Sequence, residues 1–487
     1  MSHLKSIRFS PFQVSVLTLL TFVLCSICGG IGFVAIRLNV AASPPMVAAL
    51  TPLPLTEAQP PSTPIPTSLP PTWTPSPIPS ATAVAVPSAT ATYVVAPALI
   101  NKKKIGQIVE FVELYRGLTL PTAVPIKFLT RRQLQEQWRE TSFDVAALEA
   151  VQTQQEFYRA LNLIEPEVDL VQAAFDSQTD ILLGYYTPEE KAMVIIAESV
   201  NMFAEEEMTF AHEYVHALQD HHFDLQQVFN NNLSGDALLA ARSLPEGDAR
   251  LVEDLFTRQN IRQDQIEYNI YRYLFREHPK LEGVSPALGI FTYFPYTAGE
   301  YFVLYLFFQG GFSWELVNQA YQQLPASSEQ IMHPEKYLAG EMPIPVSVPD
   351  LTPALGGAWR EIDRDVLGEA GFLVWLYDQT DEQTAINAAA GWDGDTYTLW
   401  VDGDDHRVLI ESSLWASETD ALELTHAFIK AMERRGLSGQ PYPGQNALLW
   451  EDATGATLLS RVGSRVGLIV APDRATLDRV RLQFAGF

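Results

Sequence analysis

The 487-residue chain has few cysteines and few basic residues. Its two cysteines, Cys25 and Cys28, both lie in one apolar run near the N-terminus. This excludes a disulfide scaffold, and it excludes a cysteine-held zinc site in the rest of the chain. Lysine and arginine number 32 against 58 acidic residues, for a formal net charge of −26. Because nucleic acids are bound through clustered basic residues, the charge balance argues against a nucleic-acid partner.

Charged residues are absent from the apolar run at 14–36 as well. At about 1.5 Å per residue, the run is long enough to cross a hydrocarbon layer of about 30 Å. We therefore expect a cytoplasmic tail at 1–13 and a transmembrane signal anchor at 14–36. These would place a single-pass protein in the cell membrane, with its globular part outside the cytoplasm. A signal peptide cleaved near Val40–Ala42 is the alternative.

The next segment, 37–101, is rich in proline, serine and threonine. Between Ala41 and Asn101 the only charged residue is Glu57. Of the 33 prolines in the chain, 15 fall between Ala41 and Ile100. Such a composition cannot pack a core and favours extended polyproline II. We expect a disordered linker at 37–101 that acts as a stalk.

The strongest chemical signal is the pattern H-E-x-x-H at His212, Glu213 and His216. Apolar residues at helical spacing predict an amphipathic helix around it, and Glu205–Glu207 suits the first turn of that helix. Two histidines four residues apart project in parallel and can hold one Zn²⁺. Glu213 is placed to reach a water at the metal but not to ligate. Two ordinary histidines one turn apart are the alternative.

A catalytic zinc site needs a third protein ligand, and Glu246 is the candidate. It lies 30 residues after His216, which leaves room for a second helix to return beside the first. Ser243 is the expected N-cap of that helix, with a proline in its first turn. Gly247 indicates that another group approaches the backbone closely. Three alternatives stay open: Glu246 as a capping-box residue, or Glu253 or Asp248 as the ligand or as a group that orients an imidazole.

Taken together, His212–His216 and the following E-G-x-A sequence at Glu246 resemble the gluzincin metallopeptidases. The chain resembles more closely a family of uncharacterised, surface-anchored H-E-x-x-H proteins of prokaryotes, over most of Arg116 to about His426. The resemblance implies a zincin-like fold, Zn²⁺ as cofactor and a peptide or protein substrate. It also implies that the edge strand of a sheet lies above the zinc and pairs with the substrate. We assign that role to a strand ending near Ala197, preceded by a turn at 184–188.

Two further residues are candidates for stabilising the oxyanion, a task that zinc peptidases commonly give to a tyrosine or histidine. Tyr296 and His333 fall in an aromatic-rich helical region. The alternatives are a core aromatic for Tyr296 and a cap or loop residue for His333. The turn Asp402–Asp405 could bind Ca²⁺, but it lacks the spaced ligands of an EF-hand, so we expect a solvated hairpin turn.

These observations predict an α+β fold. We expect a zincin-like metallopeptidase domain at 102–350 and a smaller C-terminal α+β domain at 351–487 with helices on one face of its sheet. The predicted function is that of a membrane-anchored, extracytoplasmic zinc peptidase with Glu213 as general base. One alternative is a non-catalytic surface binding or scaffold protein on the same frame. The other is a zinc hydrolase of non-peptide amides.

Overall fold

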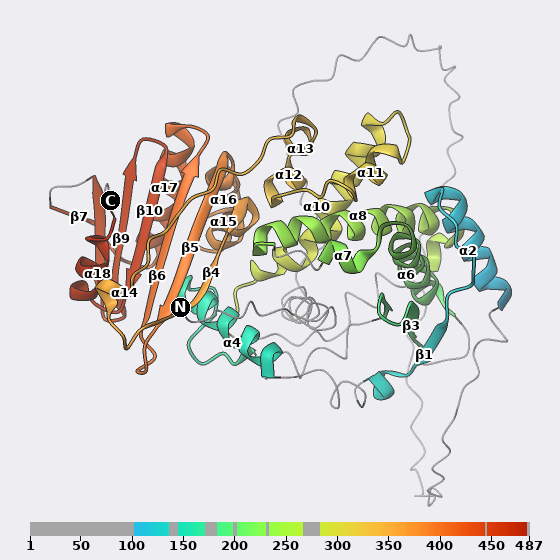
Figure 1. The fold of residues 1–487 in the computed structure, drawn as a ribbon, viewed down its shortest axis with the longest axis horizontal. Helices are drawn as coiled ribbons and strands as arrows, with labels where there is room; N and C mark the ends of the chain where they lie inside the picture. Colours follow the sequence, from blue (N-terminus) through green and yellow to red (C-terminus); the bar gives the residue numbers. More distant parts are fainter. Residues whose placement is uncertain are drawn as a thin grey trace, which may run out of the picture. The chain divides into compact units, whose positions relative to one another are not determined.

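The computed structural model describes most of the chain from Lys102 onward (Figure 1). The described residues belong to one compact unit. The predicted tail, anchor and linker (1–101) lie outside them. The described ranges are 102–134, 136, 145–170, 183–197, 202–229, 233–265, 283–443 and 446–484.

A small sheet with strand order β1-β3-β2 lies beside the candidate site. Its central strand, β3 (Ala192–Ile196), is parallel to β1 (Ile126–Leu129) and antiparallel to β2 (Gly184–Thr187). The predicted strand ending near Ala197 exists as β3, but the assignment of the edge role to it is wrong. All five residues of β3 are buried, as a central strand requires. The edge strand facing α6 is β2, in the segment predicted as a turn.

Two helices carry the candidate site. In α6 (Ala204–Phe223) the three glutamates of Glu205–Glu207 occupy the first turn, as predicted. The second helix, α8 (Gly235–Asn260), begins earlier than the predicted start at Ser243. Its N-cap is Ser234, and Pro245 lies inside the helix. The proline was misleading because packing of α8 on its neighbours outweighs the backbone hydrogen bond that a proline removes.

The helix α10 (Leu288–Gln309) crosses α8 at very short range. A Cβ atom on Gly247 would lie 2.1 Å from the backbone carbonyl of Gly299, and one on Gly299 would lie 2.2 Å from the Ser243 oxygen. The close approach predicted at Gly247 is therefore confirmed. Within the described ranges, the other helices before residue 340 are α2 (Lys102–Arg116), α4 (Val145–Ala160), α7 (Leu225–Phe229), α11 (Glu315–Ala320), α12 (Ser328–Met332) and α13 (Pro334–Ala339).

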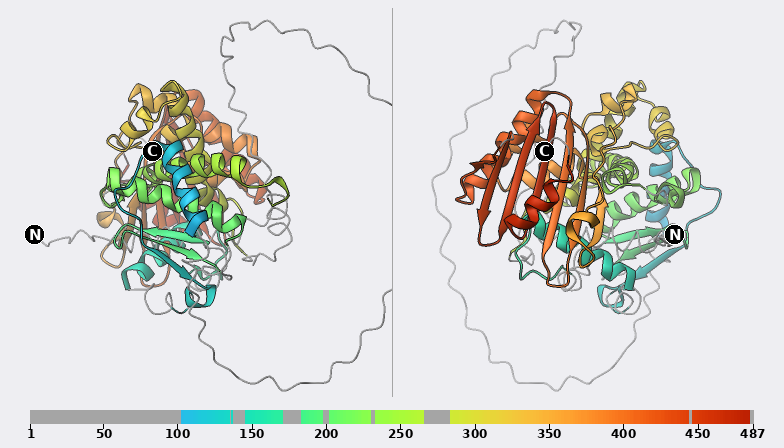
Figure 2. Two further views of the ribbon diagram at one scale, coloured as in Figure 1. Left: turned by 90° about the vertical axis from the view of Figure 1, so that its right-hand side faces the viewer. Right: turned by 60° about the vertical axis from the view of Figure 1, so that its left-hand side comes forward.

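The C-terminal part is built on a seven-stranded antiparallel sheet in the order β4-β5-β6-β10-β9-β8-β7 (Figure 2). The strands are β4 (Arg360–Asp365), β5 (Trp392–Val401), β6 (Arg407–Trp415), β7 (Gln440–Pro441), β8 (Ala447–Asp452), β9 (Gly455–Val462) and β10 (Arg465–Ala471). The helices are α14 (Thr352–Leu355), α15 (Gly368–Tyr377), α16 (Glu382–Ala389), α17 (Glu418–Arg434) and α18 (Arg474–Arg481).

Both faces of this sheet are apolar, and both are covered. Leu399 and Leu409 pack in one cluster with side chains of α15, α16 and α17. Val408 and Ile410 pack in another with residues of α14 and α18. Alternate side chains point to opposite faces of a strand, so helices are needed on both sides. The expected arrangement, with helices on one face, does not occur.

The fold class expected from the sequence, an α+β zincin-like chain, is therefore wrong, while the expected transmembrane anchor at 14–36 lies outside the described residues and stays a prediction. The described residues form a mixed α and β structure in which the small sheet combines parallel and antiparallel strands. Among these residues no helix has both the length and the apolar character needed to cross a membrane. The boundary between domains at residue 350 stays a prediction.

Candidate metal centre

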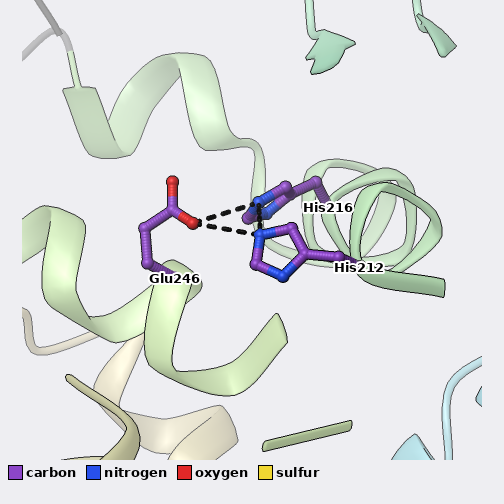
Figure 3. Close-up of side chains that lie close together, drawn as sticks. All are labelled: His212, His216 and Glu246. Carbon is purple, nitrogen blue, oxygen red and sulfur yellow. Dashed lines mark hydrogen bonds and ion pairs between the residues drawn. The ribbon is translucent and has the colours of Figure 1, made fainter. Parts of the chain in front are cut away.

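The side chains of His212 and His216 project from the same face of α6 toward Glu246 on α8 (Figure 3). The Nε2 atoms of the two imidazoles are 3.2 Å apart. Glu246 Oε2 lies 3.2 Å from His212 Nε2 and 3.4 Å from His216 Nε2. The structure thus brings the three predicted ligands together, on two helices that meet side by side.

These distances fit one small tetrahedral ion. Zinc bonds of about 2.0–2.1 Å in tetrahedral geometry separate neighbouring donor atoms by about 3.3–3.4 Å. The three observed separations are within about 0.2 Å of that value. Two imidazole nitrogens and a carboxylate oxygen are also a donor set that zinc prefers. Ion pairing between neighbouring side chains does not by itself bring three potential metal-donor atoms around one point. The arrangement therefore indicates a site for a cation.

The second nitrogen of each imidazole has its own partner. His212 Nδ1 lies 3.1 Å from Glu253 Oε2, and His216 Nδ1 lies 2.8 Å from Gln219 Oε1. Gln219 Nε2 donates to the Pro245 carbonyl, so its oxygen faces His216 as an acceptor. Both Nδ1 atoms are therefore donors, which leaves each Nε2 as the atom that would bind a metal.

Of the two alternative third ligands, Glu253 is the group that orients an imidazole. It also accepts a 2.6 Å bond from Arg250. Asp248 points elsewhere: it is fully buried and is held by Arg116 at 2.7 Å and by the Tyr321 hydroxyl at 2.8 Å. The capping-box alternative for Glu246 is excluded, because Ser243 lies inside α8.

The electrostatics of the three residues favour an ionised Glu246 beside protonated imidazoles, whose protons a metal ion would displace. Burial would raise the pKa of Glu246, but His216 and His212 outweigh it and hold the pKa far below its usual range. Burial lowers the pKa of His212, whereas Glu246 and Glu253 raise it, to about 10. The pKa of His216 is likewise raised, mainly by Glu246 against the effect of burial.

Glu213 lies next to these groups and is buried. Its pKa is raised, first by burial and also by the charge of Glu246, while His216 and His212 act in the opposite direction. Its carboxylate accepts a hydrogen bond from the backbone N–H of Tyr186 on β2. A buried carboxyl group with a raised pKa is suited to accept a proton and return it.

The two candidates for oxyanion stabilisation have different places. The ring of Tyr296 stacks on that of His212, with centroids 6.0 Å apart. Its hydroxyl bonds to Glu246, and burial followed by the charge of Glu246 raises its pKa well above 10. His333 instead bonds to Glu369 at 3.0 Å, between α12 and α13. None of the contacts of His333 in the described part of the chain reaches the triad.

Sequence reasoning missed three residues of this site: Arg242, Gln219 and Tyr186. Arg242 lies one turn before Glu246 on α8, and its charge acts on Glu246 and Tyr296. The i, i+3 and i, i+4 spacing of Gln219 from His216 and of Arg242 from Glu246 was the available signal. No local pattern marked Tyr186, since it comes from another element.

A second group that could hold a metal consists of Asp402, Asp404 and His406. It lies in the turn between β5 and β6, where Asp402 Oδ1 accepts from the backbone N–H groups of Asp404 and His406. Asp404 and His406 are exposed. These bonds are those of an ordinary hairpin turn, and exposed acidic groups are common without an ion.

The site in α6 and α8 thus has the donor set of a mononuclear metal centre with one buried carboxyl group beside it. Comparison with known proteins concerns another part of the chain: a family model described as Domain of unknown function (DUF8575) matches residues 356–481. That match covers the seven-stranded sheet and does not include the triad. No curated protein and no solved structure matches the chain.

Proposed function

We propose that the chain is a zinc-dependent peptidase in which His212, His216 and Glu246 hold the metal. The observation that carries the proposal is the convergence of three donor atoms within 3.2–3.4 Å of one another, beside the buried Glu213. Zinc held there would polarise a scissile carbonyl and lower the pKa of a water.

Glu213 is the group that takes a proton from the attacking water and passes it to the leaving amine. The raised pKa of Glu213 suits this exchange. Tyr296, whose hydroxyl lies at Glu246, is placed to donate a hydrogen bond to negative charge that develops on the substrate oxygen. The roles of general base and oxyanion donor therefore come from α6 and α10.

Among the described residues no strand pairs with the outer edge of β2, and this edge is suited to an extended peptide. Met193 on β3 donates its N–H to the carbonyl of Pro125, on the β1 side of the sheet. This N–H therefore points away from Tyr186, the residue opposite Met193 on β2. In an antiparallel pair of this kind the N–H and C=O groups of Tyr186 both point to the open edge. Glu213 occupies the N–H, which leaves the carbonyl for a substrate amide. A peptide adding to this edge would pass the triad.

The test combines metal content and hydrolysis on the full-length chain. We expect one zinc per chain by mass spectrometry and cleavage of a quenched-fluorescence peptide library. Glu213→Gln should keep the zinc and lose about 10²- to 10⁴-fold in turnover. Glu205→Gln, at the start of the same helix, is the matched control and should retain activity.

Three results would contradict the proposal or a part of it. Absence of zinc from the folded parent would exclude the metal site. Zinc binding with no cleavage of any peptide, in parent and Glu205→Gln alike, would exclude the peptidase activity and favour the surface binding protein. Equal turnover in the parent and Glu213→Gln would remove Glu213 from the mechanism.

A further inference from the structure

Asp220 lies one turn beyond His216 on α6, and its side chain is 3% exposed. Its Oδ2 accepts a 2.9 Å bond from the hydroxyl of Tyr186. Lys191, in the turn between β2 and β3, places its Nζ 3.6 Å from the same oxygen. Asp220 thus reaches the edge strand and the turn that follows it.

Tyr186 contacts α6 through both its side chain and its backbone. Its side chain donates to Asp220, and its backbone N–H donates to Glu213, two turns earlier on the helix. The strand also touches α6 at Gly184, where a Cβ atom would lie 2.7 Å from Thr209 Cγ2. The contacts at 184 and 186 follow the two-residue period of a strand, so one face of β2 lies on the helix.

We propose that Asp220 and Tyr186 are positioning residues, a pair that holds β2 against α6 and so keeps the Tyr186 amide on Glu213. For its catalytic consequence this inference rests on the proposed peptidase function. The hydrogen bond between the two side chains fixes the distance between the strand and the helix. Because the strand supplies an N–H donor to the Glu213 carboxylate, the orientation of that carboxylate depends on where the strand lies.

Tyr186 and Lys191 both contact Asp220, but they contribute differently to holding β2 against α6. The Tyr186 hydroxyl is a partly buried donor to a buried carboxylate, which is a strong type of hydrogen bond. Lys191 is 72% exposed, and an ion pair of that kind contributes little. The inference therefore assigns the positioning role to Tyr186 and Asp220, and not to Lys191.

The test uses Tyr186→Phe, which removes only the hydroxyl, in the full-length chain. Tyr185→Phe is the matched control, because Tyr185 is adjacent in β2 but packs against the Leu134, Val194 and Ile196 cluster. Hydrogen exchange of the Tyr186 amide should become about 10-fold faster in Tyr186→Phe and stay unchanged in Tyr185→Phe. This readout needs no catalytic activity.

Kinetics and a double-mutant cycle complete the test. In Tyr186→Phe we expect kcat to fall about 10-fold with zinc affinity unchanged, since the triad does not include the tyrosine. Asp220→Asn keeps an acceptor oxygen and should lose less than Asp220→Ala. The double variant Tyr186→Phe/Asp220→Ala should be no worse than Asp220→Ala alone, because both changes remove one interaction.

The outcomes separate this inference from the proposed function. If the parent binds no zinc or cleaves no peptide, the peptidase proposal fails, while the amide exchange still decides whether the pair holds β2. If the amide exchanges equally fast in Tyr186→Phe, Tyr185→Phe and the parent, the positioning pair is wrong. A zinc affinity that falls together with kcat in Tyr186→Phe would also overturn it, by indicating general disruption of the site.

Discussion

Two carboxylates lie mostly away from solvent: Glu246, 22% exposed, on α8 beside the imidazoles, and Asp395, 2% exposed, on β5 of the C-terminal sheet. Histidines hold the pKa of Glu246 far below its usual range despite its burial. Burial raises the pKa of Asp395 to about 6, although the backbone N–H groups of Leu367 and Gly368 and the indole of Trp392 all donate to it.

The same contrast extends to the groups around them. Asp236 and Glu411 also have pKa values raised well above the usual range, chiefly by burial and then by the charge of Asp395. Near Asp395, the sheet and the start of α8 gather acidic groups that favour a proton. Around Glu246, the helices gather imidazoles that favour an ionised carboxylate. Neighbours brought from other elements decide whether a buried acid retains its charge.

The largest expected effect is a change in metal affinity, which should occur at Glu246 and not at Asp395. Glu246→Gln should weaken zinc binding at least roughly 1000-fold, about 4 kcal/mol, because it removes a charged donor from a three-residue set. Asp395→Asn should leave zinc affinity unchanged. Competition with a chromogenic chelator measures both, and equal affinities for the parent and Glu246→Gln would assign the third ligand to another residue.

The crossing of α8 and α10 should show the next largest effect. Gly247→Ala places a Cβ atom 2.1 Å from the Gly299 backbone, so the helices must separate. We expect a loss of about 3 kcal/mol in the free energy of unfolding. Gly289→Ala, on α10 with nothing within 4 Å of its Cβ position, should be neutral or stabilising. Chemical denaturation measures both, and equal stabilities would disprove the close crossing.

An acid whose pKa is raised on folding stabilises the protein at low pH, whereas an acid whose pKa is lowered stabilises it at higher pH. The folded pKa of Asp395, about 6, lies above its ordinary value of 3.8, so the folded state binds the proton more tightly. Its contribution is present below about pH 4 and is lost as pH rises through about 6. The full change is about 2–3 kcal/mol.

Asp395→Asn should flatten this part of the stability profile, measured by denaturation at pH 4, 5, 6 and 7. Asp254→Asn, at an acid on the solvent-facing side of α8 that pairs with Arg258, is the control and should keep the parental slope. If the slope of Asp395→Asn equals that of the parent, other groups cause the pH dependence.

A smaller effect is expected for the residue that orients an imidazole. Glu253→Gln keeps the shape of the side chain but removes the charge that His212 Nδ1 faces at 3.1 Å. Zinc affinity should fall about 10- to 100-fold, with the metal still bound stoichiometrically at saturation. Glu300→Gln, next to Arg250 but outside the triad, should change it by less than about threefold.

Some of the site followed from local spacing. His212 and His216 lie one turn apart on a helix wherever the helix packs, so their shared face was predictable. Gly247 was correctly interpreted as a point of close approach, although its partner Gly299 could not be named. Glu246 was predicted from its separation from His216, while the extent of its helix was wrong because Pro245 resembled an N-terminal signal.

The remaining features depend on residues far apart in the chain. The contact of Tyr186 with Asp220 and Glu213 requires the order of strands in the small sheet, and no periodicity in the sequence specifies that β3 is central. Tyr296 reaches Glu246 only because α10 crosses α8 at two glycines. His333 was an equally plausible candidate in sequence, and its place beside Glu369 comes from the packing of α12 on α15.

The sequence alone therefore determined the residue types and the local geometry of the candidate metal centre, since helical spacing is a property of the backbone itself. The tertiary structure decided the third donor's position, the partner of His212 Nδ1, the edge strand and the covering of both faces of the large sheet. These depend on which surfaces are buried together, and burial joins segments whose separation along the chain carries no local signal.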